Sequence, residues 1–131
     1  MNQATITIFG ISNCDSVKTA RAWFAAQGAS ARFHDFRKDG VPQQLLSLWL
    51  ERLGWQTLLN RRGTTWRGLD AAAQLAAQDA TGALALMSAL PAVIKRPVVQ
   101  WGTGDSADVT VGFDEMAFAR ALPRAQRVPV D

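Results

Sequence analysis

The first third of the chain alternates between two hydrophobic periodicities. The β-branched and aromatic run at residues 6–9 predicts a strand that Gly10 ends. A helix is predicted next, followed by a second strand from about Ala31 to Arg37. The order β-α-β with a short crossover implies parallel strands and a right-handed connection. The apolar positions at helical intervals in the first helix are Val17, Ala20, Trp23 and Phe24.

The middle of the chain, about residues 42–90, carries helical patterns and no strand pattern. Its first predicted helix ends at Gly54, and residues 55–69 read as a polar loop between helices. Gly82 is predicted to divide the alanine- and leucine-rich stretch at 71–90 into two short helices. The apolar face of the first helix consists of Leu45, Leu46, Trp49, Leu50 and Leu53.

A strand pattern returns towards the end of the chain. Residues 93–101 are β-branched and short, and the glycine-containing turn at 102–106 separates them from a second run at 108–111. Two such runs joined by a short turn predict a β-hairpin. A final helix is predicted to begin at Asp114 and to stop at Pro123.

The predicted order is β-α-β, an inserted helical block, a β-hairpin and a C-terminal helix. This is an α/β arrangement of the thioredoxin-like type. A chain of 131 residues with 48% hydrophobic content is long enough for one domain with a real core. We predict one domain over residues 1–122, with the helical insertion at about 42–90 and a mobile C-terminal tail at 123–131.

The amino-acid composition limits the cellular location and the kinds of partner that we predict. One cysteine cannot form an internal disulfide, and no run of about 18 apolar residues occurs. The formal charge of +3 comes from scattered cations, which indicates a solvated surface with an anion pocket. We therefore predict a cytoplasmic protein without a nucleic-acid or membrane partner. His34 is the only histidine and provides neither a metal site nor a catalytic triad, so no metal is predicted.

The only cysteine, Cys14, lies at the junction between the first strand and the first helix. Ser12 and Asp15 have the spacing of a capping box, which would start the helix close to Cys14. A thiol there faces unpaired backbone N–H groups and the positive end of the helix dipole, and both favour the thiolate. The position suits a nucleophile; the alternative is a small buried cysteine without chemistry.

Pro97 is a second unusual feature, because a proline beside a buried strand removes a donor from the hydrogen-bond ladder. A cis Arg96–Pro97 bond beside the thiol would account for it, since cis bonds are essentially confined to proline.

Three separated segments resemble the arsenate reductase-like (ArsC-like) family of thioredoxin-fold proteins. They read GISNCDSVKTARAWF, LLNRRGTTWRGL and IKRPVV, and they keep the order and spacing of that family. The resemblance extends to about Leu122 and is strongest to the YffB-type branch, with the Spx-type regulators as another branch.

The resemblance implies roles for individual residues. Cys14 matches the nucleophilic cysteine of the family, and Arg96 and Pro97 match an anion-binding arginine and the cis-proline. Arg62 lies where family members place another active-site arginine, with Asn60 as the competing position. The substrate- or anion-binding residues that we expect are Arg62, Arg96, Pro97, Asn13 and Lys18.

Departures from the family patterns separate the possible activities. Asp15 follows the cysteine and would repel an arsenate dianion. A third arginine before the final helix is also missing, because no Lys or Arg occurs between Pro97 and Ala119. Val17 stands where the Spx-type regulators have the second cysteine of their redox switch, so an intramolecular switch is excluded.

These points favour a monothiol reductase, a thiol-disulfide oxidoreductase without a bound cofactor. The Cys14 thiolate would form a mixed disulfide, and an external thiol, with glutathione as the expected co-substrate, would resolve it. Arg62 and Arg96 would stabilise the thiolate and bind a carboxylate of the partner. Two alternatives stay open: a glutathione- and glutaredoxin-dependent arsenate reductase, and a non-catalytic Spx-like module that binds a protein partner.

Overall fold

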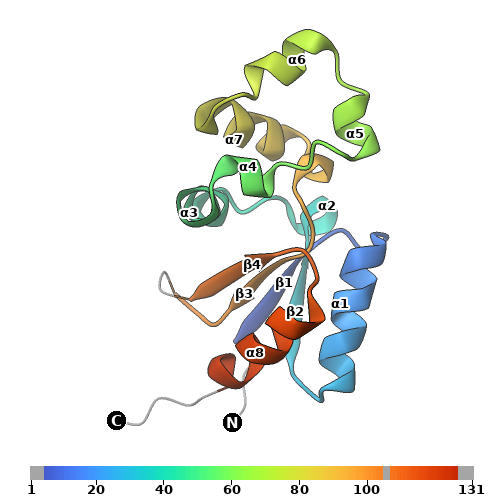
Figure 1. Ribbon diagram of the computed structural model, residues 1–131, viewed down its shortest axis with the longest axis vertical. Helices are drawn as coiled ribbons and strands as arrows, with labels where there is room; N and C mark the ends of the chain where they lie inside the picture. Colours follow the sequence, from blue (N-terminus) through green and yellow to red (C-terminus); the bar gives the residue numbers. More distant parts are fainter. Residues whose placement is uncertain (1–4, 105–106, 127–131) are drawn as a thin grey trace. The chain divides into compact units, whose positions relative to one another are not determined.

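The computed structural model describes residues 5–104 and 107–126 of the chain. The chain divides into two compact units. We call residues 1–35 and 96–131 the sheet unit, and residues 36–95 the helical unit. Figure 1 shows both with the helices and strands labelled.

The sheet unit is built on one four-stranded mixed sheet. The strand order is β2-β1-β3-β4, with β1 and β2 parallel and the other pairs antiparallel. The predicted β-α-β unit, hairpin and closing helix are thus confirmed, and the fold is α/β and thioredoxin-like. The elements of this unit are β1 (Ile6–Gly10), α1 (Asp15–Ala26), β2 (Ala31–Asp35), β3 (Val98–Trp101), β4 (Asp108–Val111) and α8 (Glu115–Ala125).

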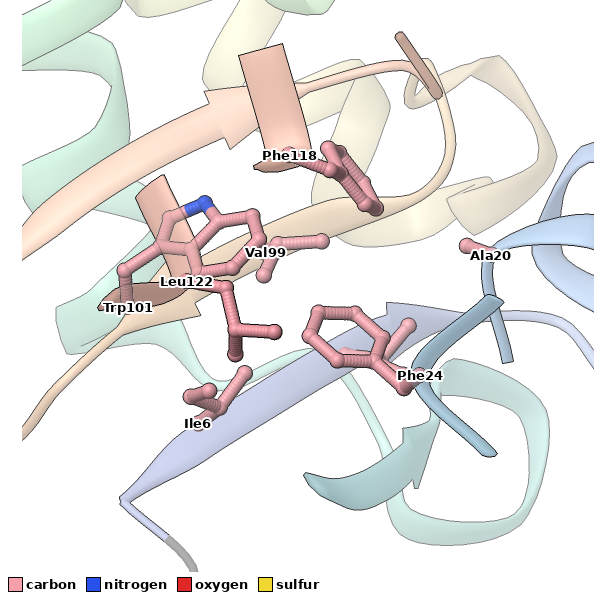
Figure 2. Close-up of a cluster of buried hydrophobic side chains, with 8 residues drawn as sticks. Ile6, Ala20, Phe24, Val99, Trp101, Phe118 and Leu122 are labelled. Atoms are coloured by element: carbon pink, nitrogen blue, oxygen red, sulfur yellow. The ribbon is translucent and has the colours of Figure 1, made fainter. Parts of the chain in front are cut away.

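One face of this sheet carries the core. Ile6 and Ile8 of β1 share a face with Val99 and Trp101 of β3, because side chains alternate along a strand and paired residues point the same way. Figure 2 shows how the side chains of α1 and α8 meet this face. The buried cluster consists of Ile6, Ile8, Ala20, Phe24, Val99, Trp101, Phe118 and Leu122.

The last helix, α8, corrects one prediction. It does not stop at Pro123 but continues to Ala125. A proline within a helix loses one hydrogen bond and disfavours helical geometry at the preceding residue. That residue is Leu122, which is 7% exposed in the core cluster, and its burial offsets the cost. The rest of the predicted tail, residues 127–131, lies outside the described part of the chain.

The start of α8 supports a stability prediction. Asp114 is its N-cap, and its carboxylate accepts hydrogen bonds from the N–H groups of Met116 (3.0 Å) and Ala117 (3.2 Å). Asp114→Ala should lower the free energy of unfolding by about 0.5–2 kcal/mol, measured by urea denaturation, because these donors lose their partner. Asp114→Asn should restore most of it, since asparagine also caps helices. Equal losses in both variants would contradict a capping role.

The helical unit contains more helices than the sequence indicates. The second strand was predicted to continue to Arg37, but it ends at Asp35 and a short helix follows. Residues 55–69, which were expected to form a polar loop, contain two short helices. The described residues hold no helix with the length and apolar character to cross a membrane. The elements of this unit are α2 (Phe36–Asp39), α3 (Gln43–Leu53), α4 (Trp55–Leu58), α5 (Thr64–Arg67), α6 (Ala71–Ala76), α7 (Ala80–Ala89) and a 3-10 helix, η1 (Pro91–Val93).

The division between α6 and α7 differs from the predicted one at Gly82. The break lies at residues 77–79, where Asp79 caps α7 by accepting a hydrogen bond from the Gly82 N–H (2.7 Å). A Cβ on Gly82 would collide with the carbonyl oxygen of Ala76. Gly82 therefore permits a close backbone approach inside a helix instead of ending one.

Residues 93–101 do not form one continuous strand. The chain passes through η1, and Ile94 forms an isolated antiparallel bridge with Leu59. Around it, the Asn60 N–H donates to the Val93 carbonyl (2.7 Å) and the Lys95 N–H to the Leu58 carbonyl (2.8 Å). Val93 and Ile94, which the sequence assigned to the strand, thus lie in η1 and in this bridge, and β3 begins only at Val98.

Candidate active site

Cys14 is the N-cap residue of α1. Its backbone is extended (φ −88°, ψ 128°), its N–H donates to the Ile11 carbonyl (3.1 Å), and its carbonyl accepts from the Lys18 N–H (3.0 Å). A Cβ on Gly10 would lie 2.5 Å from Cγ2 of Val17, so a glycine allows the end of β1 to approach the first turn of α1. The strand, the short loop and the helix together fix the position of the partly buried thiol.

The predicted capping box is wrong, although the helix begins where it was expected. Ser12 is exposed, and it is not the N-cap residue of α1. Cys14 takes the N-cap position instead, which leaves the N–H groups of Ser16 and Val17 to the sulfur. These are backbone N–H groups of the kind that the sequence places beside a thiol at a helix start.

The surroundings of the sulfur favour the thiolate. Burial raises the pKa of the Cys14 thiol, but the Val17 N–H, the hydrogen bond and charge of the Arg96 guanidinium, and the Ser16 N–H lower it more. The net effect is a pKa below that of an ordinary cysteine. Backbone dipoles at a helix start and a nearby arginine are two of the settings in which cysteines become nucleophilic.

Arg96 reaches Cys14 from the start of β3. The Arg96–Pro97 peptide bond is cis, as predicted. Pro97 is buried, and its carbonyl accepts a hydrogen bond from the Gly112 N–H (2.8 Å) just beyond β4. The guanidinium is therefore carried by backbone tied into the central sheet, which limits its freedom beside the thiol.

Two further residues of the sheet unit were predicted to bind the substrate or an anion, Asn13 and Lys18. Asn13 and Lys18 are exposed, and neither is among the described groups that lower the pKa of Cys14. Asp15, the first residue of α1, is also exposed. The structure thus brings Arg96 to the thiol and leaves the side chains of Asn13 and Lys18 in solvent.

Arg62 and Asn60 belong to the helical unit. The Asn60 side-chain oxygen accepts a hydrogen bond from the Arg62 N–H (3.0 Å), and a Cβ on Gly63 would lie 2.9 Å from the Asn60 side-chain nitrogen. Asn60 therefore shapes its own loop, whereas the Arg62 side chain is exposed. Of these two competing positions, Arg62 is the one free to bind an anion, and that role stays a prediction.

Metal ligands do not gather in the described ranges: no three side chains of the His, Cys, Asp or Glu type lie together there. His34 packs against the ring of Phe9, with ring centroids 5.1 Å apart.

The fold and this site define a thioredoxin-like protein with a single activated cysteine at the start of its first helix. The family model of the ArsC family matches residues 9–121. The chain belongs to the ArsC family, which supports a thiol-dependent reductase at the level of the family.

Individual relatives agree with this assignment. A Haemophilus influenzae protein of uncharacterised function is 36% identical over 117 residues, which is 89% of this chain and 98% of that protein. The solved structure of the YffB protein is 42% identical with a TM-score of 0.82, covering 90% of this chain and 99% of that one. An arsenate reductase (ArsC) related protein from Brucella melitensis is 36% identical with a TM-score of 0.70, covering 92% and 96%.

Proposed function

We propose that this protein is a glutathione-dependent monothiol reductase that acts on mixed disulfides. The observation that carries the proposal is the surroundings of Cys14, where Arg96 and two backbone N–H groups lower the pKa of the thiol. A thiol with a pKa near ambient pH is the best attacking group for disulfide exchange. We place the reaction in the cytoplasm, where glutathione keeps thiols reduced.

In the first step, the Cys14 thiolate attacks the glutathione sulfur of a mixed disulfide between a substrate and glutathione. A bond forms between the Cys14 sulfur and that sulfur while the original S–S bond breaks. The bonding electron pair leaves with the substrate thiolate, which takes a proton from solvent. The substrate is thereby reduced, and Cys14 carries glutathione.

In the second step, the thiolate of a second glutathione attacks the glutathione sulfur held on Cys14. Glutathione disulfide forms and Cys14 leaves as a thiolate. The resolving thiol must come from outside because the chain has one cysteine. The two electrons that reduce the substrate therefore come from glutathione.

Arg96 serves both steps in this proposal. Its charge stabilises Cys14 as attacking group and as leaving group, and the planar guanidinium can pair with a carboxylate of glutathione. The sequence resemblance adds Arg62 as a second anion-binding residue, with Asn13 and Lys18 beside the cysteine. These three additions rest on the sequence.

The two alternatives have less support. Arsenate would approach a thiolate next to the exposed carboxylate of Asp15, and like charges repel. A purely non-catalytic binding module would have no use for the groups that lower the pKa of Cys14. The reductase uses both the helix start and Arg96.

The test is the pH dependence of iodoacetamide alkylation at Cys14, in native protein and in protein unfolded in urea. The unfolded chain should react with a midpoint near the ordinary thiol value of about 8.5. The native midpoint should lie lower because of Arg96 and the N–H groups. In parallel, the wild type should turn over a glutathionylated peptide with reduced glutathione, whereas Cys14→Ser should be inactive.

Two outcomes would count against the proposal. A native midpoint at or above that of the unfolded chain would remove its physical basis. Equal turnover by wild type and Cys14→Ser would show that the chemistry does not pass through this thiol.

A further inference from the structure

The positive charge of the chain is concentrated in one unit. The sheet unit contains seven Lys and Arg and seven Asp and Glu, and is formally neutral. The helical unit contains seven Lys and Arg but only four Asp and Glu. The whole formal charge of +3 therefore belongs to the helical unit.

Three arginines within seven residues make the largest contribution. Arg61, Arg62 and Arg67 lie on the segment from Asn60 to Arg67, which we call the arginine loop, and all three side chains are exposed. No acidic residue occurs in the sequence between Arg52 and Asp70. Within the part of the chain that the structure describes, none of these three arginines forms an ion pair.

The two acidic residues that follow the arginine loop in the sequence, Asp70 and Asp79, each cap a helix. Asp70 caps α6 by accepting a hydrogen bond from the Ala73 N–H (2.8 Å). Asp79 caps α7 in the same way through the Gly82 N–H (2.7 Å). Both carboxylates thus already accept a hydrogen bond from the start of a helix.

The backbone of the arginine loop is held in place. Asn60 bonds to the Val93 carbonyl and, through its side chain, to the Arg62 N–H. Trp66 is 8% exposed and anchors the other end of the loop in the helical unit. Charged side chains on a fixed backbone lose less entropy on binding, which favours a recognition role.

We propose that the arginine loop binds an acidic polypeptide segment of a partner protein. Arginine forks pair with carboxylates in a bidentate manner. Single-stranded nucleic acid would require exposed aromatic rings for base stacking. Trp66, the aromatic residue of the loop, is buried, and the ring of Trp55 in α4 lies under the Arg61 guanidinium, 5.9 Å from the ring centroid.

The test is a titration of the full chain with poly-L-glutamate at 50 and 200 mM salt. The double variant Arg61→Gln/Arg67→Gln should bind about 10-fold more weakly than wild type at the lower salt concentration. The control Arg120→Gln/Arg124→Gln removes two exposed cations from α8 and should change affinity less than about 2-fold. Arg62 stays unchanged in both variants because it belongs to the proposed substrate site.

The single variant Arg67→Gln and an oligothymidylate, as a second probe, are measured in the same titration. Arg67→Gln leaves the contact between Arg61 and Trp55 intact and should show part of the loss in affinity, with the far-UV circular dichroism of the wild type. Equal losses in the loop variant and the α8 control would overturn the proposal, because binding would then follow net charge alone. Tighter binding of an oligothymidylate than of poly-L-glutamate, lost in the same loop variant, would overturn it in favour of nucleic acid. None of these measurements depends on thiol exchange, so their outcome is separate from that of the proposed reductase.

Discussion

Arg96→Gln should raise the pKa of Cys14 and lower mixed-disulfide turnover at neutral pH by about 10- to 100-fold. A hydrogen bond to a charged group contributes roughly 1.5–3 kcal/mol, and glutamine keeps a donor but removes the charge. Burial, which raises the pKa of the thiol, would then be opposed by the N–H groups of Val17 and Ser16 and by a neutral donor, without the charge of Arg96. The measurement is the pH profile of iodoacetamide alkylation together with turnover of a glutathionylated peptide.

The sign of the accompanying stability change follows from the direction of the shift. In the wild type the pKa of Cys14 is lower in the folded chain than in the unfolded chain, so the folded chain binds fewer protons between the two values. The free energy of unfolding should rise with pH across that interval, and this contribution is lost as pH falls through the folded pKa. Arg96→Gln should narrow the interval and flatten the rise.

Lys18→Gln is the matched control for Arg96→Gln. It removes a cation one turn beyond Cys14, but the Lys18 side chain is exposed and is not among the described groups that lower the thiol pKa. Its alkylation profile should therefore match that of the wild type. A profile shifted as far as that of Arg96→Gln would mean that general charge, and not the hydrogen bond of Arg96, sets the reactivity of Cys14.

Phe118→Ala should have the largest effect on stability, with a loss of about 3–5 kcal/mol in the free energy of unfolding. Phe118 is 1% exposed and joins α8 to the core of the sheet unit. Its ring lies 4.9–5.6 Å, between centroids, from those of Phe113, Trp101, Trp23 and Phe24. Removing the ring takes away the packing partner of four aromatic side chains and leaves a cavity. Urea denaturation followed by circular dichroism measures the loss.

Met116→Ala provides the comparison on the same helix. Met116 is 71% exposed, so its truncation should change the free energy of unfolding by no more than about 0.5 kcal/mol. Similar losses in the two variants would show that burial of the Phe118 ring does not account for the loss, because alanine is the best helix former and helix propensity cannot lower stability in either variant. A loss below about 1 kcal/mol for Phe118→Ala would contradict the aromatic cluster as the centre of the sheet unit.

Local patterns were enough to predict most of the larger elements. The alternation in β1 and the helical spacing of α1 and α3 reflect burial of one face, and such a face repeats in the sequence with the period of the element. The hairpin of β3 and β4 follows from two β-branched runs around a glycine turn. The helix starts at Asp114 and near Cys14 were also predicted, because capping depends on neighbouring residues.

Elements that depend on distant contacts were mispredicted. Helices α4 and α5 have four residues each, too few for a periodic pattern. Gly82 was expected to divide two helices, but it lies inside α7, where the Ala76 carbonyl leaves no room for a Cβ. Pro123 remains helical because Leu122 is buried in the core. At Gly82 and Pro123, contacts in the folded chain outweigh the local preference on which a sequence prediction depends.

In the candidate site, too, local sequence predicts some features and contacts between distant residues determine others. The sequence by itself determined that Cys14 stands at the start of a helix, because a strand, a glycine and a helical repeat are neighbours along the chain. The resemblance suggested Arg96 and its cis-proline as site residues. That the Arg96 guanidinium lowers the pKa of Cys14, while Asn13 and Lys18 are exposed, follows from the folded structure alone. The physical reason is that pairing of β1 with β3 joins residues far apart in sequence, and such contacts leave no periodic pattern along the chain.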